Sequence, residues 1–180
     1  MHYYCHQFEK ILMSKPFEYF ERNIERISEK LEGMPKEQVV STRLLFYVFK
    51  GVHERLNQFL ADYDLTSTTF FALVMIYASE QNKINPCDLS DAVFSSRTNV
   101  TRFADELVER GWVERQASTE DRRRIELSLS PAGQALVEKV LPDNWEMIRA
   151  LWSDFSQQEI SELHRLLRKL AVGLDPSKDE

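Results

Sequence analysis

The spacing of apolar residues changes from a helical period to a period of two only once along this 180-residue chain. Two short runs between residues 112 and 129 alternate apolar and polar side chains, as half-buried β-strands do. Elsewhere, apolar residues recur every three or four positions, which is the spacing of helices that bury one face. This single β signal predicts one hairpin packed against helices, and therefore a mainly α fold.

Capping signals divide the helical part of the chain. Helices are expected over residues 14–31, 36–63, 66–77, 86–93, 96–110, 131–155 and 157–172. Thr66, Asn85, Ser96, Ser130 and Ser156 are the expected N-terminal caps, and Gly111 is expected to end the helix before the hairpin. Pro142 is expected to kink or interrupt the helix in which it lies, because proline lacks the N–H group that a helix interior needs.

The two helices before the hairpin form a candidate DNA-binding unit. They are joined by a tight turn, and the second exposes small polar and basic residues in its first two turns, a pattern suited to the major groove. These side chains can donate hydrogen bonds to phosphates or base edges. The predicted DNA-contacting residues are Ser95, Ser96, Arg97, Thr98, Asn99, Thr101, Arg102, Arg115, Arg122, Arg123 and Arg124.

The net charge of the chain argues against this interpretation until its distribution is considered. The formal charge is -6 and the sequence pI is about 5.4, whereas phosphate neutralisation needs a positive surface. Residues 97–124 nevertheless hold seven arginines against six carboxylates. The basic surface is therefore local. The alternatives are a solvated helix face for Arg97 and Arg102, and a charged hairpin tip for residues 122–124.

The same residues resemble those of a known family. The run from Asp88 to Arg102, the segment from Asp105 to Arg115, and the segment from Asp121 to Gly133 are similar to winged-helix regulators of the MarR family. The resemblance covers about residues 40–172. Within it, residues 95–112 together with Leu141-Pro142 are most similar to efflux-pump repressors of the family. Gln116, where many members have arginine, and Ser130, where threonine is commoner, depart mildly from the pattern.

The resemblance implies a winged helix-turn-helix fold with a small β-hairpin wing and a helical dimerisation region. Three parts are expected: N-terminal helices at 1–65, a DNA-binding region at 66–131 and C-terminal dimerisation helices at 132–175. The implied function is that of a homodimer that represses transcription until a small aromatic or phenolic effector binds. Arg123 would enter the minor groove of a double-stranded operator, and Asp121 would orient it. The helix at 14–31 lies outside the common family core.

An effector cleft is implied between the dimerisation helices and the winged region. Tyr47, His53, Phe59 and Phe71 are the candidate ligand-binding residues. From their spacing alone, the aromatic residues among them are more often part of a hydrophobic core than of a ligand site. His53 could meet an anionic ligand, or it could be a partly exposed structural histidine.

Other kinds of chemistry have weaker support in the sequence. The four histidines lack metal-ligand spacing and no nucleophile or phosphate-loop motif occurs, so neither an enzyme, a cofactor nor a metal site is expected. The two cysteines show no disulfide or zinc pattern, and no apolar run could span a membrane, which favours a cytoplasmic protein. Two alternatives remain open: an oxidant sensor that uses Cys5 or Cys87, and a protein-interaction adaptor that uses the wing fold without DNA.

Overall fold

The structure, a computed structural model, describes residues 15–93, 96–117 and 125–174. The chain divides into two compact units, Met1–Gln58 and Phe59–Glu180. Helix α3 (Lys36–Ala61) begins in the first unit and ends in the second.

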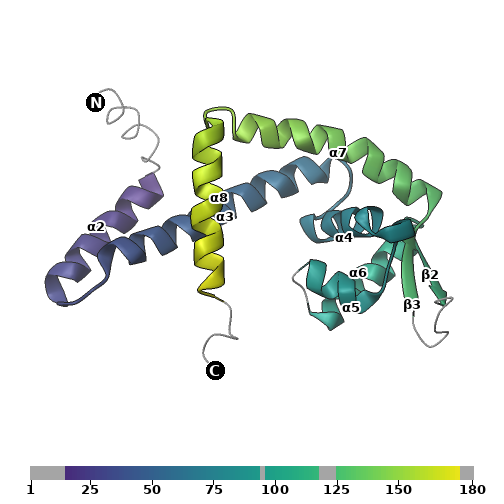
Figure 1. The fold of residues 1–180 in the computed structure, drawn as a ribbon, viewed down its shortest axis with the longest axis horizontal. Helices are drawn as coiled ribbons and strands as arrows, with labels where there is room; N and C mark the ends of the chain where they lie inside the picture. Colours follow the sequence, from purple (N-terminus) through teal and green to yellow (C-terminus); the bar gives the residue numbers. More distant parts are fainter. Residues whose placement is uncertain (1–14, 94–95, 118–124, 175–180) are drawn as a thin grey trace. The chain divides into compact units, whose positions relative to one another are not determined.

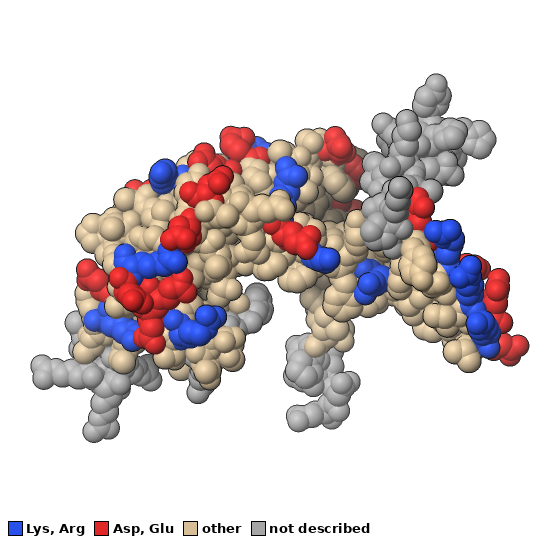
Figure 2. All heavy atoms as spheres, turned by 180° about the vertical axis from the view of Figure 1, so that it is seen from behind, with Lys and Arg blue, Asp and Glu red and all other residues tan. Residues whose placement is uncertain are grey.

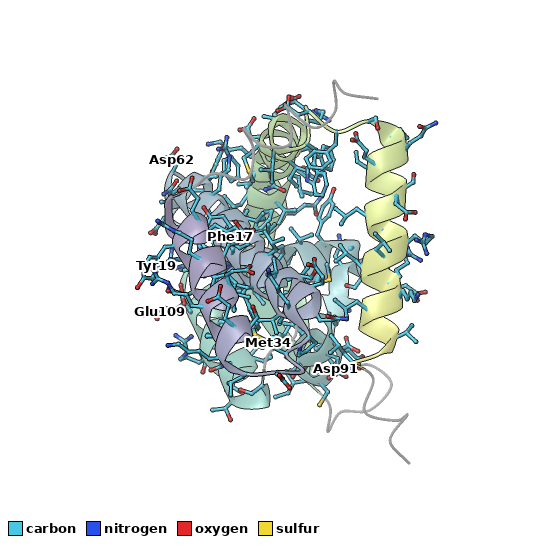
Figure 3. The ribbon with its side chains drawn as sticks, turned by 90° about the vertical axis from the view of Figure 1, so that its left-hand side faces the viewer. Phe17, Tyr19, Met34, Asp62, Asp91 and Glu109 are labelled. Carbon is cyan, nitrogen blue, oxygen red and sulfur yellow. The ribbon has the colours of Figure 1, made fainter. Side chains whose placement is uncertain are left out.

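The first unit pairs α2 (Lys15–Lys30) with the greater part of α3. Phe17 and Ile24 of α2 are buried, and the ring of Phe17 lies 5.7 Å from that of Tyr47 on α3. Tyr19 is exposed on the outer side of the same helix, as Figure 3 shows. The amphipathic pattern predicted for residues 14–31 therefore forms a helix that packs through one face.

The second unit contains every strand and most of the helices that the structure describes, as Figure 1 shows. Its elements are α4 (Ser67–Ala78), a 3₁₀ turn η1 (Glu80–Asn82), β1 (Lys83–Ile84), α5 (Pro86–Ala92), α6 (Arg97–Glu109), β2 (Val113–Ala117), β3 (Ile125–Leu129), α7 (Pro131–Leu151) and α8 (Gln157–Val172). The order of α5, α6 and the β2–β3 hairpin is the order predicted from the sequence, and the mainly α winged-helix fold is confirmed.

The sheet has one more strand than the sequence predicts. Strands β2 and β3 pair in antiparallel fashion from Val113 opposite Leu129 to Ala117 opposite Ile125. The two residues of β1 pair with the other edge of β3, which gives the order β1-β3-β2. The expectation of a hairpin alone is wrong because β1 is too short to display a period of two.

The core of the second unit lies between α4, α6 and the sheet. Leu73 and Ile76 of α4, Phe103 and Leu107 of α6, and Leu127 of β3 are all almost completely buried. Helix α4 lies centrally, as its apolar composition predicts. The buried face of α6 packs against this core.

Helix α7 is not interrupted by proline. It runs without a break through Pro142, and Figure 1 shows a bent helix. Of the two outcomes expected for Pro142, the bent and continuous helix fits the kink and excludes the interruption, although a proline in a helix interior costs about 3 kcal/mol. Val140 and Asn144, on either side of Pro142, are buried, and their packing offsets the lost hydrogen bond.

Candidate nucleic-acid interface

Side-chain caps fix both helices of the helix-turn-helix. The Asn85 side chain accepts hydrogen bonds from the backbone N–H groups of Cys87 and Asp88, each at 2.9 Å. Ser96 caps α6 by accepting the N–H of Asn99 at 3.3 Å. Each cap satisfies donors that the first turn of a helix leaves open, so the start of α6 is set by its own sequence.

One face of α6 is buried and the other is open. Val100, Phe103, Ala104 and Leu107 are at most 2% exposed and hold the helix against the core. Ser96, Thr98, Asn99, Thr101 and Arg102 are exposed. The sequence-predicted residues of this helix that the structure describes are thus brought together on one accessible surface, which we call the α6 face.

Several predicted residues lie outside the described part of the chain. These are Ser95 and the hairpin residues Asp121, Arg122, Arg123 and Arg124, together with the side chain of Arg97.

Two arginines near the end of α6 have carboxylate partners. Arg115, predicted to contact phosphate, is half-exposed, and its guanidinium lies 2.5 Å from Asp105. Arg110 pairs with Asp64 at 2.6 Å and with Glu106 at 3.3 Å. Sequence reasoning missed the Asp64 contact, because Asp64 lies 46 residues before Arg110 and no local pattern links them.

The junction of α6, β2 and α7 is unusually tight. The Ser130 hydroxyl donates to the Gly111 carbonyl at 2.6 Å and also accepts the N–H of Gly133 at 3.0 Å. A Cβ atom on Gly133 would lie 2.0 Å from the carbonyl oxygen of Trp112. Gly111 has φ +73°, the left-handed conformation predicted for the end of α6. These contacts fix the base of the hairpin against the start of α7.

Charge on the molecule is mixed. On the side drawn in Figure 2, lysines and arginines lie among aspartates and glutamates. Arg102, on the α6 face, makes no ion pair with any acidic residue that the structure describes. It is therefore available to an anionic partner.

The four candidate ligand residues are divided between the two units. Tyr47 and His53 lie in the first, and Phe59 and Phe71 lie in the second. Tyr47 lines a cavity of about 490 Å³ together with Arg43, Phe46, Lys50, Gly51 and Glu54.

The other three candidates all contact neighbouring rings. His53 stacks on Phe49 with ring centroids 5.7 Å apart. Phe59 packs against Tyr63, and Phe71, which is 45% exposed, packs against Phe70.

The cysteines, the possible metal ligands and the longer helices bear on the other kinds of chemistry. Cys5 lies outside them, and Cys87 is an exposed free thiol in the first turn of α5. In the described ranges, no group of three or more histidine, cysteine, aspartate or glutamate side chains is placed to hold a metal ion. Nor does any helix in those ranges have the length and apolar character needed to cross a membrane.

Comparison with known proteins supports the same interpretation. The chain is 34% identical to the transcriptional repressor MprA of Escherichia coli K12 over 93% of this chain and 96% of that protein. It is 26% identical to the repressor YetL of Bacillus subtilis over 75% of this chain and 81% of YetL. A MarR mutant from E. coli, solved in complex with operator DNA, matches with a TM-score of 0.68 and 26% identity, over 77% of this chain and 99% of that one.

The family profile matches the part of the chain that contains the candidate site. The sequence profile described as the MarR family matches residues 65–125, which run from just before α4 to the first residue of β3. The α6 face and strand β2 lie within this stretch. The chain therefore belongs to the MarR family of transcriptional regulators.

Proposed function

We propose that this chain is a cytoplasmic transcriptional repressor that binds a pseudo-palindromic operator as a homodimer and is released by small aromatic or phenolic compounds. The observation that carries the DNA-binding part is the α6 face. It presents Thr98, Asn99, Thr101 and Arg102 in the first two turns of a helix whose other face is buried. A helix that enters the major groove reads bases with residues in these positions.

The predicted roles of individual residues follow from their chemistry. Side chains between Ser95 and Arg102 would read bases, while Arg115, Arg122 and Arg124 would contact phosphate and Arg123 would enter the minor groove. Arg115 would exchange its partner Asp105 for a phosphate, at little cost because exposed ion pairs contribute only about 0–1 kcal/mol. MprA and YetL are named repressors, and the MarR mutant was solved on operator DNA. These relatives support the same function here.

The test of DNA binding begins with a duplex that the wild-type protein selects from a random pool. We expect Arg102→Ala to weaken binding to that duplex and to reduce the preference for it over a scrambled duplex, because a contact that reads a base is lost. Arg149→Ala is the matched control, since Arg149 is exposed near the end of α7 and pairs with Glu146. Equal losses in both variants, or failure to select any duplex, would contradict the proposal.

The proposed homodimer is supported by apolar surface that a single chain leaves open. Helix α8 buries none of its residues, and Leu166, Leu167 and Leu170 form an exposed stripe along it. Phe46, Val48 and Phe49 of α3 are also exposed. Contiguous apolar surface of this kind marks interaction sites, and two-fold symmetry would match two recognition helices to a pseudo-palindrome.

We propose an effector site beside Tyr47 in the first unit. The cavity beside Tyr47 is lined by the rings of Phe46 and Tyr47, by Arg43, and by Lys50 and Glu54, whose charged groups lie 3.7 Å apart. Arg43 is therefore the cation that would bind the charged group of an aromatic anion. The effector must bind more tightly to a dimer whose recognition helices are wrongly spaced, because only differential affinity shifts the population.

The effector is tested by adding benzoate or phenol to the protein–duplex complex, with acetate as the non-aromatic control. We expect the aromatic compounds alone to release DNA, and we expect Tyr47→Ala to reduce their effect. Release by acetate to the same extent would contradict an aromatic site.

A further inference from the structure

The turn between α3 and α4 contacts the end of α6. Asp64 lies in this turn, and both its carboxylate and its backbone carbonyl accept hydrogen bonds from the same nitrogen of Arg110, at 2.6 and 3.0 Å. Arg110 is the C-terminal cap of α6. The contact therefore joins this turn to the C-terminal end of α6, whereas the α6 face lies in the first two turns of that helix.

Two further residues, Glu106 and Trp112, contact the Arg110 guanidinium. Its other terminal nitrogen lies 3.3 Å from a Glu106 oxygen, and its guanidinium carbon lies 5.0 Å from the centroid of the Trp112 ring. A planar guanidinium can stack and donate from several nitrogens at once, which an ammonium cannot do. The arrangement gives Arg110 one defined position, although Asp64 itself is 87% exposed.

The residue before Asp64 makes an equivalent contact with α7. The Tyr63 hydroxyl donates to the Asp143 carboxylate at 2.5 Å, and the Lys139 ammonium lies 5.8 Å from the centroid of the Tyr63 ring. Asp64 has φ +55°, a left-handed conformation that aspartate and asparagine tolerate better than most residues. With the chain turned in this way, two neighbouring side chains contact two different helices.

Helix α6 is thus tied to α7 at two separated places. One is the junction of Gly111 and Trp112 with Ser130 and Gly133 at the start of α7. The other runs from Arg110 through Asp64 and Tyr63 to Asp143, twelve residues into α7. The buried face of α6 already packs against the core, and these two attachments further constrain its direction relative to α7.

We propose that the Asp64–Arg110 pair is a positioning element for DNA recognition, which holds the direction of α6 relative to α7 and thereby sets operator affinity. The inference rests on the proposed DNA-binding function. Asp64 and Arg110 do not touch DNA in this scheme; they act through the placement of the α6 face.

The direction in which operator affinity changes when the Asp64 carboxylate is removed distinguishes a positioning role from a purely electrostatic one. Removing a carboxylate from a protein makes it less acidic and strengthens its attraction to phosphate at every DNA sequence. A positioning role predicts the opposite for the operator, because a misdirected helix loses contacts that only the cognate sequence offers. Asparagine is the suitable replacement at residue 64, since it is nearly isosteric and tolerates φ near +55°.

The experiment compares Asp64→Asn with Asp62→Asn, which removes the same charge from an exposed position two residues away. Affinity is measured by fluorescence anisotropy for the duplex that the wild type selects and for a scrambled duplex of equal length. We expect Asp64→Asn to weaken binding to the selected duplex about 5- to 10-fold. Its affinity for the scrambled duplex should be unchanged or slightly higher, and Asp62→Asn should weaken neither.

Two further measurements complete the test. Tyr63→Phe breaks the same connection, so the double variant with Asp64→Asn should lose no more operator affinity than the larger single loss. The thermal midpoint should fall by no more than about 3 °C in Asp64→Asn, because exposed ion pairs contribute little stability.

Unchanged operator affinity in Asp64→Asn, or an equal loss on both duplexes, would overturn the positioning role. If the wild type selects no duplex at all, the proposed DNA-binding function itself has failed, so the two failures are distinguishable.

Discussion

Gly133 is the glycine at which an added side chain would meet the closest neighbour. A Cβ atom there would lie 2.0 Å from the Trp112 carbonyl oxygen and 2.9 Å from its carbonyl carbon. Both are backbone atoms, so no side chain can rotate away. The sequence indicates a helix that starts at Pro131 but gives no sign of this contact, because the contacting residue lies 21 positions earlier and across the hairpin.

Gly133→Ala is therefore expected to destabilise the protein by about 2 kcal/mol or more, the cost of overpacking a rigid site. The measurement is urea unfolding followed by circular dichroism. Gly51→Ala is the control: it lies in the interior of α3 with no atom within 4 Å of a new Cβ. It should stabilise the chain by up to about 1 kcal/mol, because alanine favours a helix over glycine. A Gly133→Ala variant as stable as the wild type would contradict the structure at this junction.

Residue-level predictions from the sequence succeed where the partner is local. Thr66, Asn85, Ser96, Ser130 and Ser156 all cap helices as predicted, since each cap contacts a residue two or three positions ahead. The distant partner of Arg110, Asp64, and the partner of Arg115, Asp105, could not be predicted in the same way. Asp64 and Asp105 meet them only after α6 has packed against the core and β2 has turned back.

At the scale of elements, α8 depends on its first turn. Ser156 accepts the N–H of Glu159, and the Glu159 carboxylate accepts the N–H and hydroxyl of Ser156, which completes the predicted capping box. The helix buries none of its own side chains. Local interactions therefore contribute a large share of its stability in a single chain.

This capping box predicts a pH dependence. Hydrogen bonds from the Ser156 backbone and side chain lower the pKa of Glu159 below its ordinary value of 4.5. A lowered folded-state pKa stabilises the helix above pH 4.5, and the contribution disappears as pH falls through the folded-state pKa. Glu159→Gln should thus reduce the helical circular dichroism at pH 7, and its difference from the wild type should disappear as pH falls through the lowered folded-state pKa. A difference that does not change with pH would contradict the assignment.

The spacing of apolar residues predicts the longer elements but not strand β1 or the path of the chain at Pro142. The helices and the β2–β3 hairpin follow from apolar spacing because each is long enough to repeat its pattern. Strand β1 has two residues and exists only because β3 offers a free edge, with Lys83 opposite Ser128. Pro142 marks a local cost, but the buried neighbours that offset it are visible only in the folded unit. Tertiary context decides both cases.

At the scale of the whole molecule, the formal charge of -6 weakens non-specific binding to DNA and does not exclude specific binding. Carboxylates of the second unit hold Arg110 and Arg115, and within the described ranges Arg102 is left without an acidic partner on the α6 face. An acidic molecule with a few well-placed cations gains little from non-specific contacts. Its affinity then depends on the simultaneous fit of two α6 faces, which makes dimerisation essential to the proposed function.

The last prediction concerns that dimer. Leu166 is 47% exposed in the stripe along α8, and Leu166→Glu would place a charge where we propose that the second chain packs. Burial of an unpaired carboxylate opposes association, so sedimentation equilibrium should give the mass of one chain, where the wild type gives two. Helical content should persist, because Leu166 supports no core within the chain. Operator affinity should fall at least about 100-fold, since two linked half-sites become one.

Gln158→Glu is the matched control for this variant, as it adds the same charge to an exposed position in the first turn of α8. It should remain dimeric and bind the operator as the wild type does. A Leu166→Glu protein that keeps the mass of two chains would exclude the α8 stripe from the interface. A monomeric variant that still binds the operator with wild-type affinity would show instead that one α6 face suffices, and the requirement for two-fold symmetric recognition would then fall.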